Sequence, residues 1–122
     1  MDIYAYNILD HYQRPRHFGS MDNADASFHE LNRSCGDDVT VFVKLKDGLI
    51  EAISFEGHGC AIALATASII SDSLLGKTRL AVLAMDLVDL QPLLGIEISP
   101  RRQKCALISL RALQGALKQL PV

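Results

Sequence analysis

The chain of 122 residues carries 49% apolar side chains, enough to build one packed core, and we expect a single domain over residues 1–122. Its formal net charge of −2 argues against general electrostatic attraction to nucleic acid or anionic lipid. No apolar run reaches the roughly 18 residues of a membrane span, and the acidic N-terminus does not resemble a secretory signal, so we expect a cytoplasmic protein with no nucleic-acid or membrane partner.

The first 32 residues predict one helix, a loop and one short strand. Apolar residues recur at helical spacing over residues 2–13, and Pro15 ends the pattern. The polar stretch that follows contains Gly and Pro, which is typical of a loop. The run ASFHELN, residues 26–32, is a candidate third strand for the sheet that the next segment predicts.

Two alternating runs joined by Asp47 and Gly48 predict a β-hairpin. They cover residues 38–46 and 49–56, and their alternation is typical of strands with one buried face. In the first strand, the positions expected on one face are Val39, Val41, Val43 and Leu45. In the second strand, Leu49, Glu51, Ile53 and Phe55 are expected on one face, and Ile50, Ala52, Ser54 and Glu56 on the other.

The remainder of the chain predicts helices. Residues 60–77 are rich in Ala and Leu and favour a mostly buried helix that stops at Gly76. A second helix is expected over residues 79–90, before Pro92 and Gly95 break the chain. Residues 100–120 predict a long amphipathic helix with an apolar side formed by Leu107, Leu110, Leu113 and Leu117. This order of elements indicates the α+β class, with helices packed on one face of a small three-stranded antiparallel sheet.

One cysteine stands where the hairpin gives way to a helix, in the stretch FEGHGC. Free backbone N–H groups and the helix dipole favour the thiolate form of a cysteine at such a junction, so Cys60 is a candidate metal ligand or nucleophile. Gly57 and Gly59 carry no side chains that would crowd its approach to a metal or sulfur, and we expect them to supply backbone angles closed to other residues. The alternative is that Cys60 is a small buried apolar residue beside a turn.

The other two cysteines also lie at expected element boundaries, and an odd number of cysteines in a reducing compartment favours metal or thiol chemistry over disulfides. In SCGDD, Cys35 and Asp37 would present a soft sulfur and a hard oxygen on one side of the chain, a pair that suits Zn²⁺ or iron. A solvated turn is the alternative. The hairpin would return Cys60 to the edge of the sheet that holds Cys35. Spacing alone does not place Cys105, which is otherwise a typical core residue.

Four blocks of the sequence together resemble the NifU/IscU/SufU family of iron–sulfur scaffold proteins: ILDHYQRPRHFG, SCGDD, FEGHGCAIALATASIIS and KCALISLRAL. The resemblance implies iron–sulfur cluster assembly, with Cys35, Asp37, Cys60 and Cys105 as ligands of a [2Fe–2S] cluster or of one Zn²⁺. It also implies a cysteine desulfurase as the sulfur donor and downstream acceptor or carrier proteins for the cluster. Within this family pattern, Cys35 is the candidate acceptor of persulfide sulfur.

Two sequence features point to different subtypes of this family. Lys104 stands before Cys105, as in SufU-like members, where IscU-type members have His. The stretch between Cys60 and Cys105 lacks the insertion typical of SufU. A cluster scaffold and a zinc-dependent sulfurtransferase therefore both stay open, with a SufU-like leaning. A structural-zinc interaction domain without sulfur or iron turnover is the alternative from another class.

Overall fold

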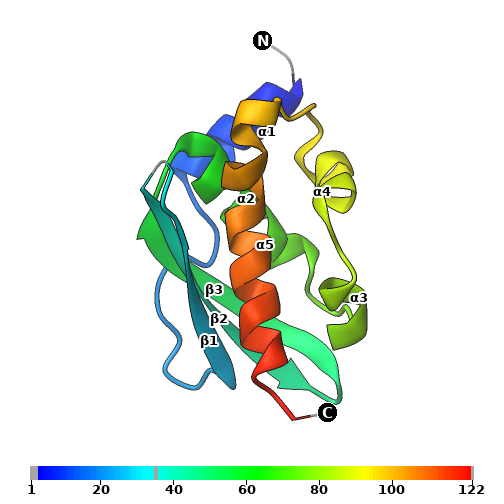
Figure 1. Ribbon diagram of the computed structural model, residues 1–122. Coiled ribbons are helices and arrows are strands. Elements are labelled where there is room, and N and C mark those ends of the chain that lie inside the picture. The colour runs from blue at the N-terminus through cyan, green and yellow to red at the C-terminus, as the bar shows by residue number, and fades with distance from the viewer. Residues whose placement is uncertain (1–2, 35, 122) are drawn as a thin grey trace.

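The computed structural model describes residues 3–34 and 36–121, and its α+β fold has a three-stranded antiparallel sheet, as predicted (Figure 1). In chain order the elements are α1 (Ile3–Gln13), β1 (Ala26–Asn32), β2 (Asp37–Lys46), β3 (Leu49–His58), α2 (Ala61–Ser73), α3 (Arg79–Leu83), α4 (Leu87–Leu94), the 3₁₀ turn η1 (Pro100–Arg102) and α5 (Gln103–Lys118).

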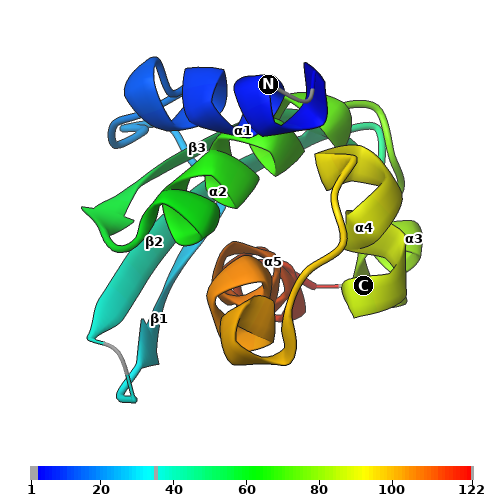
Figure 2. The same cartoon turned by 90° about the horizontal axis from the view of Figure 1, so that it is seen from above.

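The hairpin forms the centre of the sheet, because β2 lies between β1 and β3 and both pairings are antiparallel. Asp47 and Gly48 make the turn between β2 and β3 with φ of 54° and 78°. Both values lie in the left-handed region that tight two-residue hairpin turns require. Helices α2 and α5 lie on the same side of the sheet (Figure 2). The predicted hairpin and the candidate strand over residues 26–32 are confirmed.

The core lies between the sheet and helices α2 and α5. Its largest fully buried side chains from β2 and α5 are Val39, Val41, Val43, Leu110, Leu113 and Leu117. Leu107, also expected on the apolar side of α5, is only partly buried. In the part of the chain that the structure describes, no helix combines the length and the apolar character needed to cross a membrane.

The second hairpin strand departs from simple alternation. The register shifts between Lys44 and Leu45, as at a β-bulge, which leaves one residue of β3 without a direct partner. Ile50 is 2% exposed and joins the core, whereas Leu49 is 42% exposed. The prediction that Leu49 shares a face with Ile53 was wrong. The bulge shifts the alternation of β3, so that Ile50 points to the core and Leu49 to solvent.

The expectation of one helix over residues 79–90 was also wrong. The chain forms α3 and then α4, since Asp86 caps a new helix there. Its side chain accepts the backbone N–H of Leu87 over 2.7 Å, while the Asp89 carboxylate accepts the N–H of Asp86 over 2.8 Å. Pro92 lies within α4, and the helix ends only at Gly95, where φ is 71°.

Candidate metal centre

Three potential metal ligands lie together at one end of the sheet. One ligand atom from each of Asp37, Cys60 and Cys105 lies within 4.8 Å of the other two. Asp37 is the first residue of β2, Cys60 is the N-cap of α2, and Cys105 is the third residue of α5. The cluster therefore joins the sheet to both helices that pack against it.

The hairpin explains how Asp37 and Cys60 meet. Strand alternation carries Asp37 to the same inner face as Val39, and the two residues are 5% and 0% exposed. At the other end of the hairpin, His58 pairs with Asp38, so the chain leaves β3 beside Asp37 and begins α2 three residues later. Cys60 therefore lies at the end of the sheet that holds Asp37, whereas its expected convergence with Cys35 concerns a residue outside the described range.

The carboxylate of Asp37 is buried and only half satisfied. The backbone N–H of Cys60 donates to Oδ1 over 3.2 Å. Among the described residues, Oδ2 is buried and accepts no hydrogen bond. A buried polar atom left unpaired costs about 1–3 kcal/mol, and a cation beside it removes that cost. Oδ2 of Asp37 is thus available to a metal ion from within the fold.

The two sulfur atoms complete a donor set with mixed character. Cys60 begins α2 without a capping hydrogen bond from its side chain, so the helix does not use its sulfur. Cys105 is 5% exposed, at the edge of the core. Two cysteine sulfurs and a carboxylate oxygen are ligands that Zn²⁺ and iron both accept. Asp37, Cys60 and Cys105 therefore fit either metal and would be the residues that hold it.

The two glycines before Cys60 have different structural roles. A Cβ added at Gly59 would lie 3.2 Å from both Cγ and Oδ1 of Asp37, so this glycine leaves room for the carboxylate. At Gly57, φ is 154° and an added Cβ would lie 2.1 Å from the backbone oxygen of Asp38. The expected unusual backbone angle is therefore confirmed at Gly57, whose missing side chain permits the close pairing of β3 with β2 and does not serve the approach to Cys60.

The structure places three of the four predicted ligands and leaves the fourth outside its range. Cys105, which spacing could not place, lies with Asp37 and Cys60. Cys35 lies outside the described residues. The sequence pattern assigned no role to His29 or His58. Both lie within 3.6 Å of the Asp38 carboxylate, a contact that only the strand register could have revealed.

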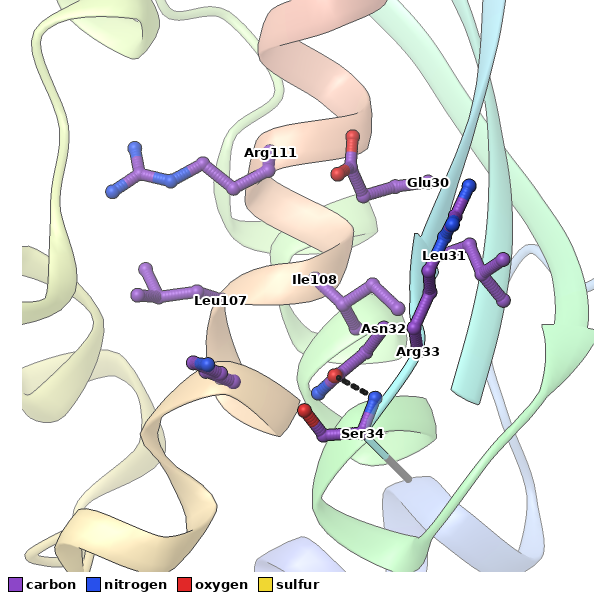
Figure 3. Close-up of a pocket in the computed structure, with 9 residues that line it drawn as sticks. Glu30, Leu31, Asn32, Arg33, Ser34, Leu107, Ile108 and Arg111 are labelled. Carbon is purple, nitrogen blue, oxygen red and sulfur yellow. Dashed lines mark hydrogen bonds between the residues drawn. The ribbon is translucent and has the colours of Figure 1, made fainter. Parts of the chain in front are cut away.

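A groove of about 380 Å³ runs between β1 and the first turns of α5, next to the metal centre (Figure 3). Ser34 and Lys104, the sequence neighbours of Cys35 and Cys105, line it together with Arg33. The side chain of Arg111 turns away from β1 in Figure 3, since it binds Asp86 over 2.9 Å. The groove is therefore mixed in charge, with Glu30 and Arg33 on the β1 wall and Lys104 on the α5 wall.

Comparison with known proteins agrees with this site. Residues 3–121 match the family model of the NifU-like N terminal domain. The chain belongs to this family. Proteins that it resembles are named for cluster assembly or for zinc-dependent sulfur transfer, which are the two roles that the donor set fits.

Two relatives and one solved structure align with this chain over most of both chains. The iron–sulfur cluster assembly scaffold protein IscU of Streptococcus pyogenes serotype M1 is 31% identical, over 96% of this chain and 84% of its own. The zinc-dependent sulfurtransferase SufU of Bacillus subtilis is 32% identical, over 92% and 87%. A candidate SufU scaffold of the SUF system from Fervidobacterium islandicum has a TM-score of 0.78 and 28% identity, over 94% and 96%.

Proposed function

We propose that this chain is an iron–sulfur cluster assembly protein. It holds a nascent [2Fe–2S] cluster as cargo, or accepts persulfide sulfur from a cysteine desulfurase, at a site formed by Cys35, Asp37, Cys60 and Cys105. The observation that carries the proposal is the buried carboxylate of Asp37. One of its oxygens lies within 4.8 Å of two cysteine sulfurs, and its Oδ2 has no hydrogen-bond partner within the described part of the chain. Relatives named for both roles support it.

In the scaffold role, the mixed donor set explains how cargo is released. Iron binds thiolates through soft, covalent bonds and a carboxylate through a harder and more easily exchanged one. Asp37 is the single oxygen donor of the proposed ligand set, so the bond to its carboxylate is the first to yield to an incoming ligand from an acceptor protein. Its hydrogen bond from Cys60 keeps the carboxylate oriented meanwhile.

In the sulfurtransferase role, Cys35 is the proposed acceptor. Its thiolate attacks the outer sulfur of the desulfurase persulfide, the sulfur–sulfur bond of the donor breaks, and the donor cysteine leaves as a thiolate. The step moves one neutral sulfur atom and needs no external oxidant or reductant. Zinc, when bound, would keep its cysteine ligands deprotonated. Asp37, Cys60 and Cys105 would hold the site together while Cys35 reacts.

The groove beside the centre is the proposed contact for the sulfur donor. It ends at Ser34 and Lys104, next in sequence to two of the cysteines. A donor segment that carries its persulfide to Cys35 must approach from outside the fold, and Arg33 and Lys104 would attract carboxylates that flank such a segment. A cysteine desulfurase with an acidic rim around its active-site loop is the partner that this chemistry suits.

Native mass spectrometry tests the proposal by counting metal and sulfur together. The protein, purified without oxygen, is measured before and after incubation with cysteine, ferrous iron, a dithiol reductant and a desulfurase that is active on a SufU or IscU protein. Gain of two irons and two sulfides shows scaffold function. The ferrous ions then supply two of the four electrons that reduce the two sulfur atoms, and the reductant supplies the other two. Retained zinc with one added sulfur shows sulfur transfer.

Two controls make a negative result decisive. The same desulfurase must load a known relative in parallel, so that a mismatched donor is recognised. Asp22→Ala, which removes an exposed loop carboxylate, should load like the parent. If zinc stays bound and neither sulfur nor iron is gained while the relative is loaded, the proposal fails and the structural-zinc alternative stands.

A further inference from the structure

The face of the sheet opposite the helices carries a second group of metal-binding side chains, one from each strand. Nε2 of His29 on β1 lies 3.3 Å from Oδ1 of Asp38 on β2. Nδ1 of His58 on β3 lies 3.6 Å from Oδ2 of the same carboxylate. The side chains of His29, Asp38 and His58 are 51%, 30% and 93% exposed, so solvent ions reach all three.

Strand register gathers these residues. Asp38 pairs directly with His58, and His29 lies diagonally across β1, because its own partner on β2 is Thr40. Direct neighbours on one face of an antiparallel pair lie about 4.5–5.5 Å apart at Cβ, and diagonal neighbours stay within reach of long or aromatic side chains. The backbone thus holds both imidazoles on either side of one carboxylate.

We propose that His29, Asp38 and His58 form a second binding site, for a divalent transition-metal cation such as Zn²⁺ or Fe²⁺. Two imidazoles with one carboxylate make a ligand set that these ions favour and that leaves positions open. Two ligands of a tetrahedral zinc ion, each bonded at about 2.0–2.1 Å, lie about 3.3 Å apart. The separations of 3.3 and 3.6 Å between imidazole nitrogen and carboxylate oxygen are close to that value, but they reach different oxygens of Asp38. The ligand atoms of the three residues do not all lie within 4.8 Å of one another, so binding of one ion requires a side-chain rotation.

The surroundings of Asp38 favour a bound cation over two simple histidine–aspartate ion pairs. Asp38 and His58 line a surface hollow of about 310 Å³, together with Glu56, whose carboxylate adds a further negative charge. His58 is almost fully exposed, so its ring can turn to bring a nitrogen onto the same ion as His29. Gly57, next to it, leaves the floor of the hollow without a side chain.

The second site is separate from the cysteine centre, because the two lie on opposite faces of the sheet. Asp37 and Asp38 are consecutive residues of β2, so strand alternation sends their side chains to opposite faces. Asp37 is buried against the helices, whereas Asp38 faces the open side. The ligands of the second site include no sulfur, and its occupation does not depend on sulfur transfer or on cluster assembly.

Zinc titration of the full chain tests the proposal. We expect native mass spectrometry to count two zinc ions per chain in the parent and one in His29→Gln, His58→Gln and Asp38→Asn. Loss of a ligand should weaken the second binding step more than tenfold, since even outer-shell partners of metal ligands are worth about 10–100-fold. His17→Gln is the matched control, because His17 also lies beside a carboxylate, 3.2 Å from Asp72, but in a single pair.

Nuclear magnetic resonance assigns the second ion to its ligands. In Cys60→Ser, which weakens the cysteine centre, zinc should still shift the imidazole signals of His29 and His58 and leave those of His17 in place. A single zinc ion in the parent overturns the proposal. So does a second ion that persists unchanged in His29→Gln and His58→Gln, because it would then be held elsewhere.

Discussion

The backbone N–H of Cys60 donates to Oδ1 of Asp37 over 3.2 Å, which ties the first residue of β2 to the residue that begins α2. The other oxygen of the same carboxylate is buried without a hydrogen-bond partner among the described residues. The Asp37 side chain therefore links β2 to α2 through one oxygen and leaves its second oxygen available to a metal. Substitutions at Asp37 should separate these two roles.

Replacement of Asp37 by alanine should make a bound cluster longer lived. The substitution removes the oxygen donor that we propose as the exchangeable ligand, so transfer to an acceptor should slow by about tenfold or more. The decay of the visible cluster absorbance in the presence of an apo acceptor protein measures this rate.

Asp37→Asn serves as the comparison for that variant, since its amide oxygen can still accept the N–H of Cys60 but carries no charge. Both variants should slow transfer if the ionic bond to the metal controls release. Faster cluster loss from Asp37→Ala would contradict the exchangeable-ligand argument.

Replacement of Cys35 by serine should abolish persulfide acceptance and leave the fold intact. A serine hydroxyl is nearly isosteric with the thiol but is not a thiolate nucleophile. Alkylation of the protein after reaction with the desulfurase, followed by mass spectrometry of peptides, locates the added sulfur. Full acceptance by Cys35→Ser would transfer the acceptor role to Cys60 or Cys105.

Gly59→Ala should weaken metal binding at the cysteine centre with little effect on the fold. The added Cβ would press on Cγ and Oδ1 of Asp37 at 3.2 Å and displace the carboxylate by a few tenths of an ångström. We expect zinc affinity to fall by about tenfold, a typical effect of disturbing the orientation of a ligand. Competition with a chromophoric chelator measures the affinity.

Gly57→Ala provides the contrasting variant. Its Cβ would meet the backbone oxygen of Asp38 at 2.1 Å, and its φ of 154° is rarely adopted by other residues. We expect a loss of about 2 kcal/mol or more in the free energy of unfolding. Equal effects of the two substitutions on urea unfolding and on zinc affinity would show that neither glycine has the separate role assigned to it.

Zinc should stabilise the fold and protect the segments that the centre joins. A ligand bound only by the native state raises stability by mass action, and this site links β2, α2 and α5. Hydrogen exchange of backbone amides should slow at the start of α2 and of α5 when zinc is added to the metal-free protein. Faster exchange there on adding zinc would rule out a stabilising centre.

Local pattern was sufficient to predict the hairpin and the position of Cys60 at a helix start, because both depend on neighbours in sequence. It could not place Cys105, since the chain between Cys60 and Cys105 could follow many different paths. It also missed the break before α4. There, the capping pair of Asp86 and Asp89 starts a new helix within an apolar run that otherwise favours a continuous one.

Two further features depend on strand register, which no single strand reveals. Burial of Ile50 depends on the bulge at Lys44 and Leu45. The contacts of His29 and His58 with Asp38 depend on how three strands align. A register shift of one residue would send these side chains to the other face, so they become predictable only once the pairing is known.

Stability should fall as the pH drops through the ordinary range of histidine, through His11 in α1. Burial lowers the pKa of His11 below its usual 6.5, and the nearby Arg16 guanidinium adds to the effect. Ser68 Oγ lies 2.7 Å from Nδ1 of His11 and accepts the backbone N–H of Arg16 over 2.8 Å. Its hydroxyl proton is therefore free to donate to a neutral imidazole, an interaction that joins α1 to α2.

The direction of the pH effect follows from proton binding. With a lower pKa in the native state, His11 binds more protons when unfolded, so its contribution to stability is present above pH 6.5 and is lost as pH falls toward the native pKa. Urea midpoints at about pH 7.5 and about pH 5.5 should differ less in His11→Gln than in the parent. His17→Gln, which removes an exposed imidazole paired with Asp72, is the control. An unchanged pH dependence in His11→Gln would show that the contact with Ser68 persists when the imidazole is charged.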